Sequence, residues 1–111
     1  MKVDLQKHGS VKVVVPQDAI TEAAVEDLQH ALEAEAHEAA VRLVVDMTRV
    51  PYVDSAGIEF LLALAGDASA GALRARLAGL TETVREALSL TDMLKRFHIF
   101  DTVEAAVRSY V

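Results

Sequence analysis

The run Val53-Asp54-Ser55-Ala56-Gly57 is the one local feature of the sequence that hydrophobic periodicity does not explain. It joins an expected strand to an expected helix, which places Ser55 at or next to the helix N-cap. Serine and aspartate are favoured there because their side-chain oxygens accept backbone N–H groups that lack partners within the helix, a contact worth roughly 1 kcal/mol. On local physical chemistry alone, helix capping is the simplest interpretation.

The same geometry also suits a phosphorylation site. A helix N-terminus presents free N–H donors and about half a positive charge, which together tolerate a phosphate. Gly57 lacks a Cβ, so another backbone or a kinase can approach the first turn closely. A phosphate on Ser55 would add a charge of about −1.5 to −2. It would repel an acidic partner and place a bulky dianion where an apolar partner expects a hydroxyl.

Other chemistries are less well supported by the residue pattern. A hydrolase built on Ser55 would need Gly-x-Ser-x-Gly and a histidine oriented by an acid, and the first glycine is missing. His30 and His37 stand on either side of Glu33, but zinc-binding helices usually place two histidines four residues apart. A solvated helix face is the better interpretation of those histidines, and we expect no metal and no cofactor.

Composition narrows the function classes further. The 111 residues include 17 acidic and 11 basic side chains, for a net charge of −6 at pH 7, and no cysteine. The acidic balance argues against binding nucleic acid or anionic lipid, because both need a positive field. The absence of cysteine excludes disulfides and thiolate metal sites. The longest apolar stretch, residues 58–65, contains Glu59 and is far shorter than the ~20 residues of a membrane span, so we expect a cytoplasmic protein without membrane insertion.

Apolar spacing predicts alternating strands and helices in the order ββαβαβαβα. A β-branched run and a His8-Gly9-Ser10 break predict an N-terminal hairpin with a three-residue connection, and strands separated by helices imply parallel pairing. We therefore expect an α/β fold, with a mostly parallel sheet, an N-terminal antiparallel hairpin and about four helices. The expected strands are residues 3–7, 11–15, 42–47, 73–77 and 99–100, and the expected helices are residues 22–37, about 56–68, 82–89 and 103–107.

Three local expectations follow from this assignment. Thr21 or Asp18 is placed to cap the first helix. Arg74 and Arg76 share one strand face, which is expected to be wet or to lie at the edge of the sheet, with both arginines serving solubility. In the second helix we expect a stripe of core residues at i, i+3, i+4 and i+7, with Glu59 on the solvent side of the helix. Phe60 lies beside this stripe. It is either an ordinary core residue, which is the favoured alternative, or the edge of a partner-binding patch. The stripe consists of Ile58, Leu61, Leu62 and Ala65.

The segment from Leu43 to Ile58 resembles the core of the STAS domain family, in which an apolar strand ends in aspartate and a short loop leads to Asp-Ser-Ser/Thr/Ala-Gly. Residues 77–81, 84–91 and 93–106 also resemble that family, so the likeness extends over essentially the whole chain from Val11 onward. It implies that residues 1–111 form a single STAS-like domain. Stand-alone STAS domains of this size are similar to bacterial anti-sigma factor antagonists.

The resemblance implies a partner-switching mechanism rather than catalysis. The unphosphorylated protein would bind a GHKL-type serine kinase that acts as an anti-sigma factor, and phosphorylation of Ser55 would break the complex. A PPM-type phosphatase would restore the starting state. The expected partner-binding residues are Thr21, Tyr52, Asp54, Ser55, Ala56, Gly57, Glu59 and Phe60.

Two departures from the family pattern bear on this hypothesis. Ala56 stands where many members carry a second hydroxyl residue, so Ser55 is the only acceptor in the motif. Thr21 stands where antagonists usually carry an aspartate before the first helix. STAS domains also serve as accessory subunits of ABC-type lipid transport complexes and as stressosome-like scaffolds without a phosphate cycle, which is the main alternative function.

Overall fold

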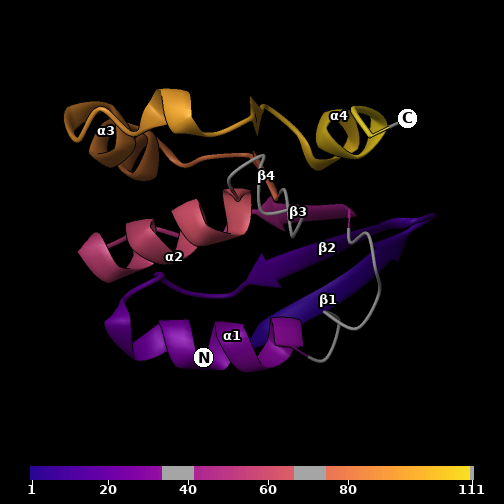
Figure 1. Cartoon of the computed structure of the whole chain (residues 1–111), viewed down its shortest axis with the longest axis horizontal. Helices are drawn as coiled ribbons and strands as arrows, with labels where there is room; N and C mark the ends of the chain where they lie inside the picture. Colours follow the sequence, from indigo (N-terminus) through magenta and orange to yellow (C-terminus); the bar gives the residue numbers. More distant parts are fainter. Residues whose placement is uncertain (34–41, 67–74, 111) are drawn as a thin grey trace.

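The computed structural model describes residues 1–33, 42–66 and 75–110. Within these ranges five strands form one sheet in the spatial order β1-β2-β3-β4-β5. β1 and β2 are antiparallel, and every later pair is parallel, as the alternation of strands and helices predicts. The α/β class, the mixed sheet and the N-terminal hairpin are therefore confirmed (Figure 1). The strands are β1 (Val3–His8), β2 (Val11–Pro16), β3 (Arg42–Asp46), β4 (Arg76–Ala78) and β5 (Ile99–Phe100).

The helices cover the two faces of the sheet unequally. In the described chain these are α1 (Glu22–Glu33), α2 (Ser55–Ala65), α3 (Glu82–Leu90), a 3₁₀ turn η2 (Leu94–Arg96) and α4 (Val103–Arg108). The main core lies between the sheet and α1, α2 and α3, where Leu28, Leu61 and Leu88 are at most 1% exposed. A smaller core on the other face packs Val13 and Val44 against α4, which lies apart from the other helices (Figure 1).

The N-terminal hairpin turns in two residues rather than the three expected. His8 pairs directly with Val11, which leaves Gly9 and Ser10 as the connection. Gly9 adopts a φ of +64°, and a positive φ at the first central residue is the pattern of a type II′ turn, where glycine is favoured. The expected break had included His8, which in fact belongs to the strand.

α2 is shorter than expected, and it buries a different face. It begins at Ser55 and ends at Ala65, whereas the sequence predicted about 56–68. Because almost every residue of this helix is apolar, hydrophobic spacing alone cannot determine its rotation. The expected stripe is therefore only partly correct. The buried residues are Gly57, Phe60, Leu61 and Leu64, while Ile58, Leu62 and Ala65 are half-buried.

β4 lies inside the sheet, between β3 and β5, so of the two alternatives expected for this strand, a wet face or an edge position, the edge position is wrong. Arg76 is half-buried rather than fully solvated: its guanidinium carbon lies 4.0 Å from the centre of the Tyr110 ring and 6.0 Å from that of Phe100. The guanidinium also donates to the Ser109 hydroxyl. Arg74 lies outside the described residues.

Tyr110 completes this cluster at the end of α4. Its hydroxyl donates a 2.8 Å hydrogen bond to the backbone oxygen of Leu43 in β3, and burial raises the pKa of the Tyr110 phenol. The arginine and the tyrosine together tie α4 to two neighbouring strands. Because α4 has only six residues, this attachment is needed to hold it over the smaller core.

We expect Arg76→Met to lower the free energy of unfolding by about 1–3 kcal/mol, because it removes the cation–π contact and the bond to Ser109 while keeping an apolar stem. Urea denaturation measures the change. Arg85→Met, on the exposed face of α3, is the control and should stay within about 0.5 kcal/mol of the wild-type protein. Equal stability of the two variants would contradict a structural role for the Arg76 cluster.

Candidate functional site

Asp54, not Ser55, is the N-cap of α2. The Asp54 backbone is extended, with φ −103° and ψ −175°, and its Oδ1 accepts a 2.8 Å hydrogen bond from the Gly57 N–H. Ser55 is the next residue, at the first helical position, and its side chain is exposed. Among the described residues its hydroxyl has no hydrogen-bond partner. Capping is thus performed by Asp54, which leaves the serine hydroxyl accessible from solvent.

The second oxygen of Asp54 reaches another helix. Its Oδ2 accepts a 3.0 Å hydrogen bond from the N–H of Glu22, the first residue of α1 and 32 positions away in sequence. The sequence had placed Thr21 or Asp18 to cap α1. Thr21 does immediately precede α1, and its backbone oxygen accepts from the Ala24 and Val25 N–H groups, while the first N–H of the helix, that of Glu22, donates to Asp54. Asp18 accepts from Ala19. The bond from Gly57, followed by that from Glu22, lowers the pKa of the Asp54 carboxyl from its usual 3.8.

Backbone contacts bring the same two segments together. The Ile20 N–H donates to the Tyr52 oxygen at 3.2 Å, and the Asp54 N–H donates to the Ile20 oxygen at 3.3 Å. Ile20 and Val53 form a parallel bridge. A Cβ on Gly57 would stand 2.0 Å from the Ile20 oxygen. The sequence allowed either another backbone or a kinase to approach Gly57 closely. In the structure the backbone of Ile20 makes this close approach.

The loop between β3 and α2 is also held from the side of α3. The Thr81 hydroxyl donates to the Val50 oxygen at 2.9 Å and accepts from the Val84 N–H at 3.4 Å, so one side chain caps α3 and anchors the loop. At the start of the loop, Asp46 accepts 3.0 Å and 2.7 Å bonds from the N–H and hydroxyl of Thr48. The segment leading to Ser55 is therefore fixed at both ends.

The expected partner-binding residues differ in how far they reach the surface. Tyr52, Ser55 and Glu59 are exposed, with 53% of Tyr52 accessible. Thr21, Asp54 and Ala56 are half-buried, whereas Gly57 is buried and Phe60 is 8% exposed within the main core. All eight cluster around the start of α2, but Gly57 and Phe60 lie beneath the surface that the others form.

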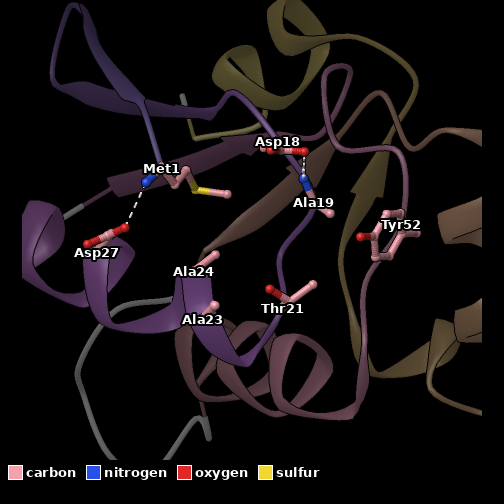
Figure 2. Close-up of a pocket in the computed structure, with 8 residues that line it drawn as sticks. All are labelled: Met1, Asp18, Ala19, Thr21, Ala23, Ala24, Asp27 and Tyr52. Atoms are coloured by element: carbon pink, nitrogen blue, oxygen red, sulfur yellow. Dashed lines mark hydrogen bonds and ion pairs between the residues drawn. The ribbon is translucent and has the colours of Figure 1, made fainter.

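An open pocket of about 220 Å³ lies beside this surface (Figure 2). Thr21 and Tyr52 line it together with Asp18, and on its far side Asp27 forms a 2.8 Å ion pair with the Met1 amino group (Figure 2). The sequence did not indicate this pocket or the part played by Ile20 and Glu22. In the sequence, Gly57 alone indicated that another backbone, which the structure identifies as that of Ile20, lies close to the start of α2.

The other reactive residues are not assembled into a site. His30 lies 3.8 Å from Glu26, and its expected companion His37 falls outside the described residues. In the described ranges no three histidine, aspartate or glutamate side chains are arranged to hold a metal ion. None of the helices in those ranges has the length and apolar character needed to cross a membrane.

The model of the STAS domain family matches residues 2–106, and the chain belongs to that family. BtrV of Bordetella bronchiseptica, whose name describes it as a candidate anti-sigma factor antagonist, is 26% identical over 110 residues, which cover 99% of this chain and 95% of BtrV. An anti-sigma factor antagonist from Mycobacterium paratuberculosis has a similar structure, with a TM-score of 0.82 at 21% identity, covering 97% of this chain and 92% of that one.

The antagonist SpoIIAA, solved in two states, has the same fold. Its unphosphorylated form gives a TM-score of 0.77 at 20% identity, covering 98% of this chain and 96% of SpoIIAA. The phosphorylated form of SpoIIAA from Bacillus gives 0.71 at 20% identity, covering 99% and 100%. At these identities the likeness establishes a shared fold.

The lowered pKa of Asp54 predicts a pH dependence of stability. Its contribution is complete above the unfolded pKa of about 3.8 and is lost as the pH falls through the lower folded value. The stability gap between the wild-type protein and Asp54→Asn should be constant from pH 5 to 7 and shrink below about pH 4. Urea titrations across that range measure the gap. A gap that stays constant down to pH 2 would contradict the assigned hydrogen bonds.

Gly57→Ala should destabilise the protein by about 1–3 kcal/mol through the clash with Ile20, although alanine is intrinsically better in a helix by roughly 0.5–1 kcal/mol. Ser55→Ala, two residues away and facing solvent, is the control and should change stability by less than about 0.5 kcal/mol. Chemical denaturation compares the two. A stabilising Gly57→Ala would show that the two backbones are not in close contact.

Proposed function

We propose that this protein is an anti-sigma factor antagonist that works by partner switching. In its unphosphorylated form it binds a GHKL-type serine kinase that is itself an anti-sigma factor, and phosphorylation of Ser55 ends that complex. A PPM-type phosphatase removes the phosphate. The observation that carries the proposal is the exposed hydroxyl of Ser55 at the first position of α2, which has no hydrogen-bond partner among the described residues, within a chain of the STAS family.

The surface around Ser55 has the mixed character of a protein-binding site. Exposed Tyr52 offers a large aromatic ring in the loop before α2, and Ile58 and Leu62, which follow Ser55 at i+3 and i+7, are half-buried where they pack against the main core. Residues at these spacings are neighbours on a helix surface, so the Ser55 hydroxyl adjoins the exposed parts of two aliphatic side chains. Partner contact should therefore involve Tyr52, Ser55, Glu59 and the Thr21 side of the pocket.

Phosphate on Ser55 would act through charge and bulk. The hydrogen bonds from Gly57 and Glu22 stabilise the charged form of Asp54 and lower its pKa, and Glu59 lies one turn from Ser55 along α2. A dianion between two carboxylates concentrates negative charge on a surface that also carries apolar groups. A partner that fits the unmodified surface would have to desolvate this charge, which is costly without a paired cation.

The protein would thus be the substrate of an enzyme and not an enzyme itself, acting in the cytoplasm. Relatives named as antagonists support a regulatory role for this chain. The alternative, an accessory subunit of an ABC-type transporter or a stressosome-like scaffold, would use the same fold without a phosphate cycle. The identity of the captured partner separates these functions.

We expect affinity capture from the native cells to recover a soluble ATP-dependent kinase, and the intact mass of the protein to show a single added phosphate.

Ser55→Ala should bind the kinase and accept no phosphate. Ser55→Asp should lose most of the binding while remaining folded, because it places a permanent charge at the contact. Ser89→Asp, on the exposed face of α3, is the matched control and should bind as the wild-type protein does.

Two outcomes would contradict the proposal. One is capture of an ABC ATPase with no phosphate on the protein, which would favour the transport alternative. The other is phosphorylation of Ser55→Ala at a different residue, which would remove the site assignment.

A further inference from the structure

We propose that Asp54 is a positioning residue that couples the two halves of the partner surface, the Thr21 segment before α1 and Ser55 at the start of α2, through its bond to the Glu22 N–H. This inference rests on the proposed function. It differs from helix capping, for which a single oxygen of Asp54 is enough. It assigns a role to the second oxygen, which reaches across to α1.

The geometry of the carboxylate carries the argument. One oxygen lies 2.8 Å from the Gly57 nitrogen and the other 3.0 Å from the Glu22 nitrogen. A carboxylate is planar and rigid, so accepting one bond at each oxygen fixes the two helix starts relative to one another. Hydrogen bonds to an ionised acceptor are also stronger than those between neutral groups.

The backbone contacts nearby do not replace this bond. They join Ile20 to Tyr52 and Asp54, ahead of α1. α1 and α2 also pack together in the main core, but among the described residues the Asp54–Glu22 bond is the one hydrogen bond that joins the first turn of α1 to the start of α2. Thr21 lies between Ile20 and Glu22, so its position depends on both attachments.

Two substitutions break the Asp54–Glu22 bond from opposite sides. Asp54→Asn keeps a good N-cap residue but has only one acceptor oxygen, which we expect to remain with the Gly57 N–H of its own helix, so the Glu22 N–H loses its acceptor. Glu22→Pro removes the N–H donor, and proline is well tolerated at the first position of a helix. Glu22→Ala is the matched control, since it removes the same side chain and keeps the N–H.

Measurements on the protein alone test the coupling. In Asp54→Asn the amide of Glu22 should exchange with solvent about tenfold faster, as expected for loss of a hydrogen bond to a charged group. The double variant Asp54→Asn/Glu22→Pro should be no less stable than the weaker single variant, because both remove the same bond. Additive losses of stability, or unchanged exchange at Glu22, would overturn the coupling.

Kinetics with the captured kinase test its effect on the surface. The KM for phosphorylation should rise about tenfold in Asp54→Asn and Glu22→Pro, while the kcat of both variants stays close to wild type. The control Glu22→Ala should keep both constants close to wild type. A simple loss of stability would not raise KM in the folded protein. An unchanged KM would overturn the positioning role. If no kinase is recovered, the proposed function fails, while the stability cycle and amide exchange still decide whether Asp54 couples the two segments.

Discussion

A helix N-terminus leaves backbone donors without partners, and in this protein one carboxylate meets that need for two helices at once. Asp54 accepts from Gly57 in its own helix and from Glu22 in another. The arrangement requires the two helix starts to lie within the span of one side chain. The close approach of Ile20 to Gly57 follows from it, and so does the need for a residue without a Cβ at that position.

The same constraint explains why Ser55 is available for modification. A serine at the N-cap would have its hydroxyl bonded to a backbone N–H, and its modification would cost the cap. Because Asp54 is the N-cap, Ser55 occupies the first helical position, and its side chain is exposed to solvent. Capping and the proposed phosphorylation are therefore assigned to two adjacent residues, so the proposed phosphate on Ser55 would leave the capping bond of Asp54 in place.

The sequence predicted the order of strands and helices along the chain, the N-terminal hairpin and the position of the motif at the start of a helix, because these depend on local periodicity and on the family resemblance. It could not predict the rotation of α2, whose apolar residues surround the helix, or the interior place of β4, which depends on pairing with β5. Arg76 appeared to be a solvated charge because its aromatic partner, Tyr110, lies 34 residues further on. The bond from Glu22 to Asp54 joins residues 32 positions apart, and no local pattern encodes it.

The net charge of −6 has less bearing on the proposed switch than the immediate neighbours of Ser55. At physiological ionic strength, interactions between exposed charges are largely screened beyond about 8 Å. Acidic residues farther than this from Ser55 therefore influence a phosphate there only weakly, and they serve mainly to keep the surface solvated. Asp54 is adjacent in sequence, Glu59 follows one turn later, and the N–H of Glu22 donates to Asp54, so these acidic residues act on the local field together with the positive end of α2. The overall acidity is thus compatible with many functions, whereas an exposed Ser55 hydroxyl at the start of α2, next to Asp54 in sequence and one turn from Glu59, favours a surface whose affinity changes with a single phosphate.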